Sequence, residues 1–256
     1  NGTLTISTGD DGVHADNELI IDNGVINISK SYEGLEAAKI TINDGTINVT
    51  ASDDGINVAG GTDQSAQQGR QGANNYSSNT NNILTINGGT IYVNSSGDGL
   101  DANGSIYVNG GNILVDGPTN NGNGALDYDR EFVMNGGTLI AGGASGMAQN
   151  ISTTSKIYGV LIGFTSTYSS NDKITIVDSN NNEIVSYKSD KSYSSLVFAS
   201  SSLKKGETYK ILVNGSEYQS FTVSSITTTV GNISGNGGMT RGNMDGNMNG
   251  QRGGRR

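Results

Sequence analysis

A turn rich in Asn, Asp and Gly recurs along the chain between short alternating strands, and this repeat constrains the fold more than any other feature. It occurs in the segments IIDNGVINI, ITINDGTINV, LTINGGTIYV, IYVNGGNILV and FVMNGGTLIA. Their second turn residues are Gly24, Gly45, Gly89, Gly111 and Gly137, which lie 21, 44, 22 and 26 residues apart. A unit of about 22 residues built from short strands is typical of a solenoid, in which neighbouring units stack to bury a continuous core.

The apolar residues within each unit alternate on both sides of the turn. Ile40 and Ile42 precede one turn, and Ile47 and Val49 follow it. This period of two is that of a strand rather than a helix, and the spacing typical of leucine-rich repeats is absent. We therefore expect an all-β fold in which residues 1–156 form the coils of a right-handed parallel β-helix, each strand lying about 4.8 Å from its neighbour in the next coil.

Three segments depart from the repeat. The polar run at 62–82 fills the double interval and reads as an inserted loop. From 157 onward, strands joined by turns such as NNNE and NGSE predict hairpins, and we expect 157–228 to form an antiparallel β cap over the open end of the solenoid. A separate ligand-binding module over the same residues is the alternative. The stretch 229–256 has no apolar period and is expected to be disordered.

Composition and charge exclude several classes of function. The chain has no Cys, which rules out a disulfide, a thiol nucleophile or a thiolate metal site. Its formal net charge of −9 argues against nucleic acid as a partner, because phosphate binding needs a basic surface. No apolar run approaches the roughly 20 residues of a membrane span, and we expect a monomer. The chain opens in the strand-like NGTLTIS, so we also expect that upstream sequence has been removed.

Acidic residues accompany a second glycine in each repeat. SDDGIN at 52–57 has relatives in GDDGVH at 9–14, SYEGLE at 31–36 and SGDGLD at 96–101. The residues directly before this glycine are Asp11, Glu33, Asp54 and Asp98, and those two positions after it are His14, Glu36, Asn57 and Asp101, a series that Asp127 continues. Stacked coils would place these side chains in two rows along one edge of the solenoid.

Two rows of stacked carboxylates predict a counter-ion. At about 4.8 Å, two carboxylates repel by roughly 1 kcal/mol in water and roughly 3–4 kcal/mol at an effective dielectric constant of about 20. Ca²⁺ binds oxygen ligands at about 2.3–2.6 Å in flexible geometry, so it suits a position between two coils better than Mg²⁺ does. The candidate calcium ligands are Asp10, Asp11, Asp16, Glu33, Glu36, Asp53, Asp54, Asn57, Asp98, Asp101, Asp127 and Asp129. The alternative is that these side chains only form turns by accepting hydrogen bonds from their own backbone, and His14 is interpreted as a turn residue or a weak neighbour of the metal.

The motifs GDDGVHAD, SYEGLEA, ASDDGINVAGG, GDGLDANGSIYVNGG and NNGNGALDYD, in this order, resemble a family of bacterial, often clostridial, cell-surface proteins described as carbohydrate-binding-domain-containing. The resemblance covers nearly all of residues 1–228. It implies a right-handed β-helix similar to polysaccharide lyases, bound calcium, and binding of cellulose and polygalacturonate outside the cell. The family's motifs map onto the acidic residues above, and the choice of those that touch metal rests on the stacking.

These observations favour a non-catalytic binder of plant cell-wall polysaccharide, in which calcium bridges protein carboxylates to those of a pectic chain. Because the chain has no Trp, any aromatic platform for a neutral sugar must come from tyrosine. The candidate sugar-binding residues are Tyr32, Tyr92, Tyr107, Tyr128 and Lys39. Tyr92 and Tyr107 fall at outward positions of their strands, but the cap or a loop could cover that face instead.

Three other functions remain open on the sequence alone. A calcium-dependent pectate lyase needs a Lys or Arg base beside the metal, for which Lys30, Lys39 and Arg130 are the candidates; a surface ion pair is the simpler interpretation of Lys39. A hydrolase would need one carboxyl group with a raised pKa in a cleft. A structural adhesin would use calcium only to stiffen the rod, and would have no affinity for sugar.

Overall fold

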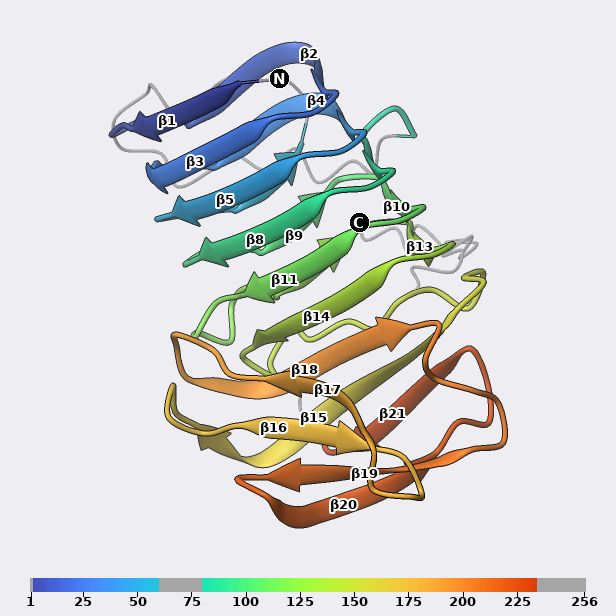
Figure 1. The fold of residues 1–256 in the computed structure, drawn as a ribbon. Coiled ribbons are helices and arrows are strands. Elements are labelled where there is room, and N and C mark those ends of the chain that lie inside the picture. The colour runs from blue at the N-terminus through green and yellow to red at the C-terminus, as the bar shows by residue number, and fades with distance from the viewer. Residues whose placement is uncertain (1, 60–79, 234–256) are drawn as a thin grey trace, which may run out of the picture.

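The computed structural model describes residues 2–59 and 80–233, and within them the chain is all-β with no helix. The coils of the first part are stacked one above the other, and the last strands close one end of the stack (Figure 1). The loop expected at 62–82 falls mostly on residues 60–79, and most of the tail expected to be disordered falls on 234–256. Both of these lie outside the described residues.

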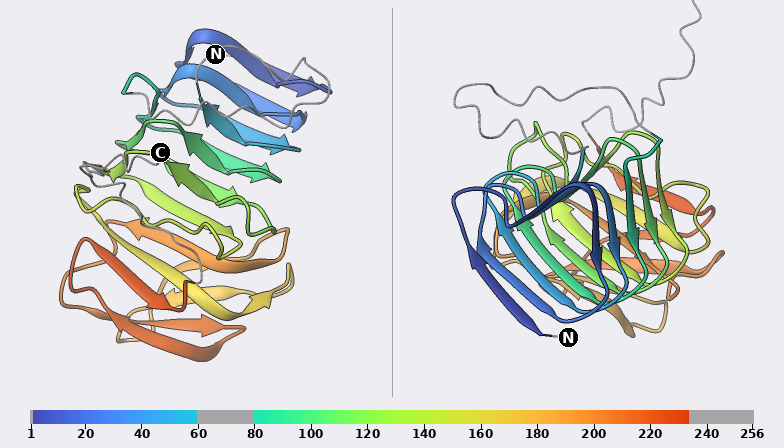
Figure 2. Two further views of the ribbon diagram at one scale, coloured as in Figure 1. Left: turned by 180° about the vertical axis from the view of Figure 1, so that it is seen from behind. Right: turned by 90° about the horizontal axis from the view of Figure 1, so that it is seen from above.

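Two sheets of parallel strands run along the stack and face each other across the core. The first begins with β1 (Thr3–Ser7), β3 (Val25–Lys30), β5 (Thr46–Ala51), β8 (Thr90–Ser95), β11 (Asn112–Asp116) and β14 (Thr138–Gly143). The second contains β2 (Val13–Ile21), β4 (Leu35–Ile42), β6 (Ile56–Val58), β7 (Ile83–Ile86), β9 (Leu100–Ala102), β10 (Ser105–Val108), β12 (Leu126–Tyr128) and β13 (Glu131–Met134). Each coil therefore contributes one strand to the first sheet and then either one long strand or two shorter consecutive strands to the second, and the view along the stack shows the coils lying over one another (Figure 2, right).

The alternating apolar residues fill the space between the two sheets. Ile40 and Ile42 from the second sheet and Ile47 and Val49 from the first are at most 1% exposed, as the period of two predicted. Such full burial stabilises by about 1.5–3 kcal/mol for each side chain of this size. The core is narrow, and each coil needs only a few inward-facing apolar side chains to fill it. A chain with only 33% hydrophobic residues can therefore form this fold.

The recurrent turn closes each coil through a glycine in the left-handed region of backbone space. Gly45 has φ +115°, and a Cβ there would lie 2.7 Å from the carbonyl oxygen of Gly24 in the preceding coil. Beside the turn, Asn43 donates through Nδ2 to Asp22 and accepts through Oδ1 from Asn87, so amide groups also follow the stack. Close stacking therefore requires glycine at this corner, which explains the repeat in the sequence.

The last part of the chain covers one end of the stack. It adds β18 (Tyr193–Ser200), β15 (Tyr158–Tyr168) and β21 (Thr227–Gly231) to the first sheet, and forms a third sheet of β17 (Glu183–Tyr187), β16 (Ile174–Val177), β19 (Thr208–Val213) and β20 (Ser216–Thr222). The strand β18 pairs antiparallel with both β14 and β15, but β15 and β21 pair in parallel. This parallel pair departs from the purely antiparallel expectation, and it arises because the chain crosses through the third sheet between the two strands.

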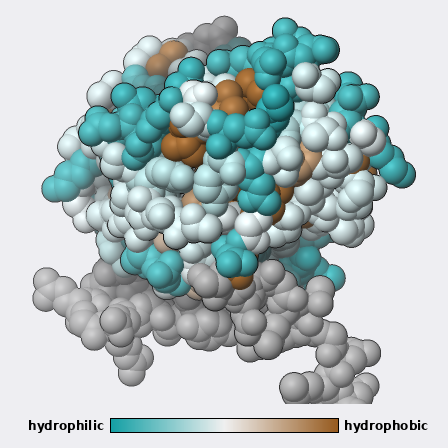
Figure 3. Space-filling model, turned by 90° about the horizontal axis from the view of Figure 1, so that it is seen from below, coloured by the Kyte–Doolittle hydropathy of each residue, from teal (hydrophilic) through white to brown (hydrophobic). Residues whose placement is uncertain are grey.

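The covering part has a hydrophobic core of its own. Phe164, Tyr193 and Phe198 lie in it, and Leu114 and Ile140 of the stack pack against it from outside. Figure 3 shows this end of the molecule, where hydrophilic and weakly polar residues surround small hydrophobic patches. The strand β21 ends at Gly231, so ordered structure extends three residues past 228, the limit expected from the sequence.

Candidate functional site

The acidic residues of the repeat gather where each coil leaves the first sheet and enters the second, and we call this edge the acidic corner. The strand register pairs His14 with Glu36, Glu36 with Asn57, Asn57 with Asp101, and Asp101 with Asp127. The sequence repeat predicted this row, and the register confirms the stacking. Binding of metal by the row stays a prediction.

The second row consists of the acidic residues directly before the corner glycine, namely Asp11, Glu33, Asp54 and Asp98. Their side chains bond to the next coil: Asp11 accepts from the Glu33 backbone N–H at 3.2 Å, and Asp54 from the Asp98 N–H at 2.6 Å. The Asp98 carboxylate accepts from the Gly124 N–H at 2.6 Å. One oxygen of each of these three Asp side chains thus has a structural role, which agrees in part with the turn interpretation.

Glycine is required at the acidic corner because the coils approach closely there. The Gly34 N–H donates to the Asp54 carbonyl oxygen of the next coil at 3.0 Å. A Cβ on Gly34 would lie 2.2 Å from the Gly55 carbonyl oxygen. The acidic side chains beside these glycines are held by the same close stacking, so their oxygens are placed before any ligand arrives.

Asp54, Asp98 and Asp101 form the tightest group of carboxylates at the acidic corner. One oxygen from each lies within 4.8 Å of the others, a spacing that allows a shared cation. All three side chains are only partly accessible to solvent. Because oxygen is the ligand preferred by hard divalent cations, this group is suited to Ca²⁺ or Mg²⁺ rather than to a soft metal.

Burial and mutual repulsion raise the pKa values of the carboxyl groups in this region. Desolvation is the largest cause in each case: it raises the pKa of Glu33 to about 9, of Asp54 to about 8 and of Asp98 to about 7, with neighbouring carboxylates adding to the effect. The pKa of Asp101 is well above its ordinary value for the same reasons. Ionising them together at neutral pH therefore calls for a positive charge close by.

Asn57 contributes a buried polar atom to this region that a ligand could satisfy. Its side chain is 6% exposed, and its Nδ2 donates to Glu33 Oε2 at 2.9 Å. Its Oδ1 is buried and has no hydrogen-bond partner within the part of the chain that the structure describes. An unsatisfied buried acceptor costs about 1–3 kcal/mol, and a cation beside it would remove that cost. The donor set therefore fits a hard divalent cation.

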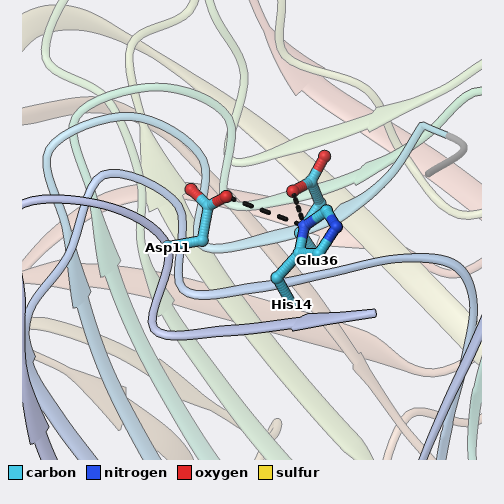
Figure 4. A group of neighbouring side chains, drawn as sticks. All are labelled: Asp11, His14 and Glu36. Carbon is cyan, nitrogen blue, oxygen red and sulfur yellow. Dashed lines mark hydrogen bonds and ion pairs between the residues drawn. The ribbon is translucent and has the colours of Figure 1, made fainter. Parts of the chain in front are cut away.

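A second group, Asp11, His14 and Glu36, comes from the two coils that precede those of the first group, and it contains the only histidine (Figure 4). His14 Nδ1 lies 2.5 Å from Glu36 Oε2 and 3.8 Å from Asp11 Oδ2, while Nε2 lies 3.3 Å from Asp16 Oδ1. Partial burial opposes protonation of His14, but its hydrogen bonds to Glu36 and Asp16 outweigh this and raise its pKa. For Asp11, whose charged form is the anion, burial instead raises the pKa, to about 6.

The remaining candidate ligands lie at the margins of these groups. Asp16 is exposed and contacts the outer face of His14. Asp10 and Asp129 are also exposed, and Asp53 is half-buried and bonds to the Tyr32 hydroxyl. Asp127 ends the row, and its Oδ1 accepts from Gln149 Nε2 at 3.2 Å.

The structure places the candidate sugar-binding tyrosines in four different surroundings. Tyr32 is 38% exposed beside the acidic corner, whereas the Tyr128 hydroxyl donates to the Asn150 carbonyl oxygen at 2.6 Å. Tyr107 donates to Glu131 Oε1 at 2.8 Å. The Tyr92 hydroxyl donates to Asp116 Oδ2 at 2.9 Å, next to the part of the first sheet that the cap covers.

The basic residues considered as lyase bases lie outside the two carboxylate groups. Lys39 Nζ is 3.9 Å from Glu18 Oε1, and both side chains are about half exposed. Arg130 lines a separate pocket of about 420 Å³ together with Tyr107 and Glu131. The sequence does not predict that Tyr107 and Arg130 are neighbours, because they meet through the pairing of β10 with β13.

Comparison with known proteins identifies the family of this chain. A search of curated proteins and a search of solved structures each found no match. Within the described residues there is no helix long and apolar enough to cross a membrane. A family model described as carbohydrate-binding domain-containing protein matches residues 1–204, which include the strands β1 to β14 of the stacked coils and the acidic corner. The chain therefore belongs to the family of carbohydrate-binding domain-containing proteins.

Proposed function

We propose that this chain is a non-catalytic, calcium-binding protein that binds plant cell-wall polysaccharides, cellulose and acidic pectic chains, at the surface of the cell. The observation that carries the proposal is the acidic corner, where partly buried carboxylates with raised pKa values lie near Asn57, whose buried Oδ1 has no hydrogen-bond partner among the described residues. Membership of a carbohydrate-binding family supports a polysaccharide as the ligand. In this proposal the stacked coils form a right-handed parallel β-helix and the protein acts as a monomer.

The calcium ligands in this proposal come from three neighbouring coils. Asp54, Asp98 and Asp101 would hold the ion, and Glu33 and Asn57 lie within the same region. Bound calcium would neutralise the carboxylates and offer open positions to carboxylates of a polyuronate. The protein's own contribution is rigidity: backbone hydrogen bonds from the next coil fix Asp54 and Asp98 before the ligand arrives.

The environment of the basic residues favours binding over lyase chemistry. A lyase base must be close to the cation and must lose its proton. Lys39 instead pairs with Glu18 at the surface, and Arg130 belongs to the pocket lined by Tyr107 and Glu131. Arginine also keeps its proton at any pH that a protein tolerates. A lyase would release unsaturated oligosaccharides, which absorb in the ultraviolet, so incubation with polygalacturonate tests this alternative directly.

Calorimetric titration of an oligogalacturonide, with calcium and then with a chelator, tests the proposed function. We expect binding with calcium, loss of binding after chelation, and weaker calcium binding in Asp54→Asn. Asp22→Asn is the matched control, because Asp22 is an exposed carboxylate that bonds to Asn43 on the opposite corner.

Three results would contradict the proposal in different ways. Binding that survives chelation would separate the sugar site from calcium. Calcium binding without affinity for any polysaccharide would favour the structural adhesin. Absence of calcium binding to the wild-type protein would remove the acidic corner as a metal site.

A further inference from the structure

A groove runs along the stack at the corner opposite the acidic one. Its volume is about 700 Å³, and it follows the recurrent turn through five coils. It is lined by Gly2, Thr3, Asn23, Gly24, Val25, Asp44, Gly45, Thr46, Gly89, Thr90, Gly111 and Asn112. These lining residues lie at or just before the first residues of β1, β3, β5, β8 and β11, whereas the residues of the acidic corner follow the ends of these strands, which the arrowheads mark in Figure 1. Strands of five or six residues separate the two edges by roughly 20 Å.

The glycine turns create the groove because they leave no side chain at the corner. Gly89 and Gly111 have φ +91° and +90°, and a Cβ on either would lie within 2.8 Å of a glycine carbonyl oxygen in the preceding coil. These positions therefore stay bare along the stack. The next residues, Thr46, Thr90 and Asn112, are exposed and form one row in register.

The row offers a polar group at three successive coils, whereas the coil before them carries Val25 at the same register position. Thr46 and Thr90 present hydroxyl groups and Asn112 presents an amide, each of which both donates and accepts hydrogen bonds. Successive groups are separated by one coil spacing, about 4.8 Å. A linear β-linked pyranose chain advances by nearly the same length per sugar residue, so a chain lying along the groove would meet an equivalent group at three successive residues.

The charge of the groove selects among polysaccharides. Its one ionisable side chain is Asp44, whose Oδ1 accepts from the Gly45 N–H at 2.8 Å. A carboxylate accepts hydrogen bonds from sugar hydroxyls and repels uronate groups. Among the residues that the structure describes, the lining contains no basic residue and no second acid with which Asp44 could share a cation.

We propose that this groove binds an uncharged linear polysaccharide along the axis of the stack, without metal. The inference rests on the proposed carbohydrate-binding function and extends it, because it gives neutral and acidic chains separate edges of the same coils. Neutral chains bind through hydroxyl, amide and backbone groups at the glycine corner, and acidic chains bind through calcium at the acidic corner.

The test is calorimetric titration of a soluble β-1,4-glucan hexasaccharide, with chelator present, into the wild-type protein and a groove variant, Thr46→Val/Thr90→Val. The β-branched replacements keep the shape and strand preference of threonine. Loss of two hydrogen bonds is expected to weaken glucan binding about tenfold. The matched control is Thr5→Val/Thr50→Val, which changes two exposed threonines of the same sheet that do not line the groove.

A second variant tests the charge of the groove. Asp44→Asn preserves the turn, because Asn23 makes the equivalent bond to the Gly24 N–H at 2.6 Å. We expect it to weaken glucan binding several-fold, since an amide oxygen is a poorer acceptor than a carboxylate. Calcium-dependent binding of an oligogalacturonide should be unchanged in every variant, which also verifies that each is folded.

The possible results separate this inference from the function on which it rests. Equal glucan binding by the wild-type protein and the groove variant would overturn the groove and leave the proposed function standing. Calcium-dependent binding of oligogalacturonide without any glucan binding by the wild-type protein would overturn the groove and the cellulose part of the proposed function, and would leave calcium-dependent binding of acidic chains standing. Absence of binding to either sugar would overturn both.

Discussion

Replacing Asp54 by Asn should stabilise the metal-free protein at neutral pH and reduce the stability that the protein gains from calcium. The substitution keeps the acceptor for the Asp98 N–H, which lies 2.6 Å from Asp54 Oδ1. The neighbouring row already holds an amide, at Asn57. What changes is therefore the charge rather than the shape of the acidic corner.

The magnitude follows from the raised pKa of Asp54. Burial moves this pKa from its ordinary 3.8 to about 8, so the folded protein keeps a proton that the unfolded chain releases above about pH 4. The metal-free fold therefore loses stability as pH rises between these two values, by about 1.4 kcal/mol per pH unit. At about pH 7.5 this reaches ~5 kcal/mol as an upper bound, and relaxation of the site brings the expected gain for Asp54→Asn to about 2–4 kcal/mol.

Urea unfolding in chelator measures this gain. Tyrosine fluorescence is a suitable signal, because the chain has 11 Tyr and no Trp. We expect Asp54→Asn to match wild type at about pH 4 and to exceed its stability increasingly toward pH 8. With calcium at about 100 times its dissociation constant, wild type should gain about 2.7 kcal/mol and the variant less.

The outcome that refutes the reasoning is specific. A loss of stability in Asp54→Asn at neutral pH, or a gain independent of pH, would mean that the carboxylate is not strained by burial and neighbouring charge. Asp22→Asn, at an exposed carboxylate on the other corner, should show little change at any pH.

Three further changes test other parts of the structure. Chelation should lower the melting temperature of wild type more at about pH 8 than at about pH 5, because the acidic corner holds its protons at low pH and needs no cation there; equal shifts in differential scanning calorimetry would contradict this. Gly45→Ala should cost about 1–3 kcal/mol in urea unfolding, because the residue has φ +115° and the new Cβ would lie 2.7 Å from the Gly24 carbonyl oxygen; a variant as stable as wild type would show that the coil spacing relaxes easily. Asp116→Ala should cost about 3 kcal/mol or more, because the Asp116 carboxylate accepts from the hydroxyls of Tyr92 and Tyr187 in a buried site; proteolysis should then release the covering part before the coils, and simultaneous digestion of both would refute a local effect.

The sequence predicted the stacking well because one physical rule governs every coil. Strand periodicity gives the inward side of Ile47 and Val49, and the glycine positions determine which residues can lie above one another. Together they predicted the row from Glu36 to Asp101 correctly. No contact between distant elements was needed for that inference.

Other features depend on contacts that a repeat does not encode. The surroundings of Tyr92 depend on Asp190, which reaches it only because β18 returns to pair with β14. The close pairing of His14 with Glu36 needs side-chain geometry that their register alone does not give. The repeat predicts the glycine turns but not the groove that they form, because bare backbone rather than a recurring type of side chain lines its centre.

The covering part also determines where the stack of coils can be lengthened. Because β18 runs antiparallel to β14, it ends the parallel repeat on that side. The strands β1 and β2 lie at the opposite end, where Leu4 is 48% and Ile20 is 54% exposed. Each coil added there would supply one more acidic position and one more glycine-corner position at once. The valency of both edges is therefore tied to a single quantity, the number of coils, and avidity for a long polymer would rise with it without any new contact being designed.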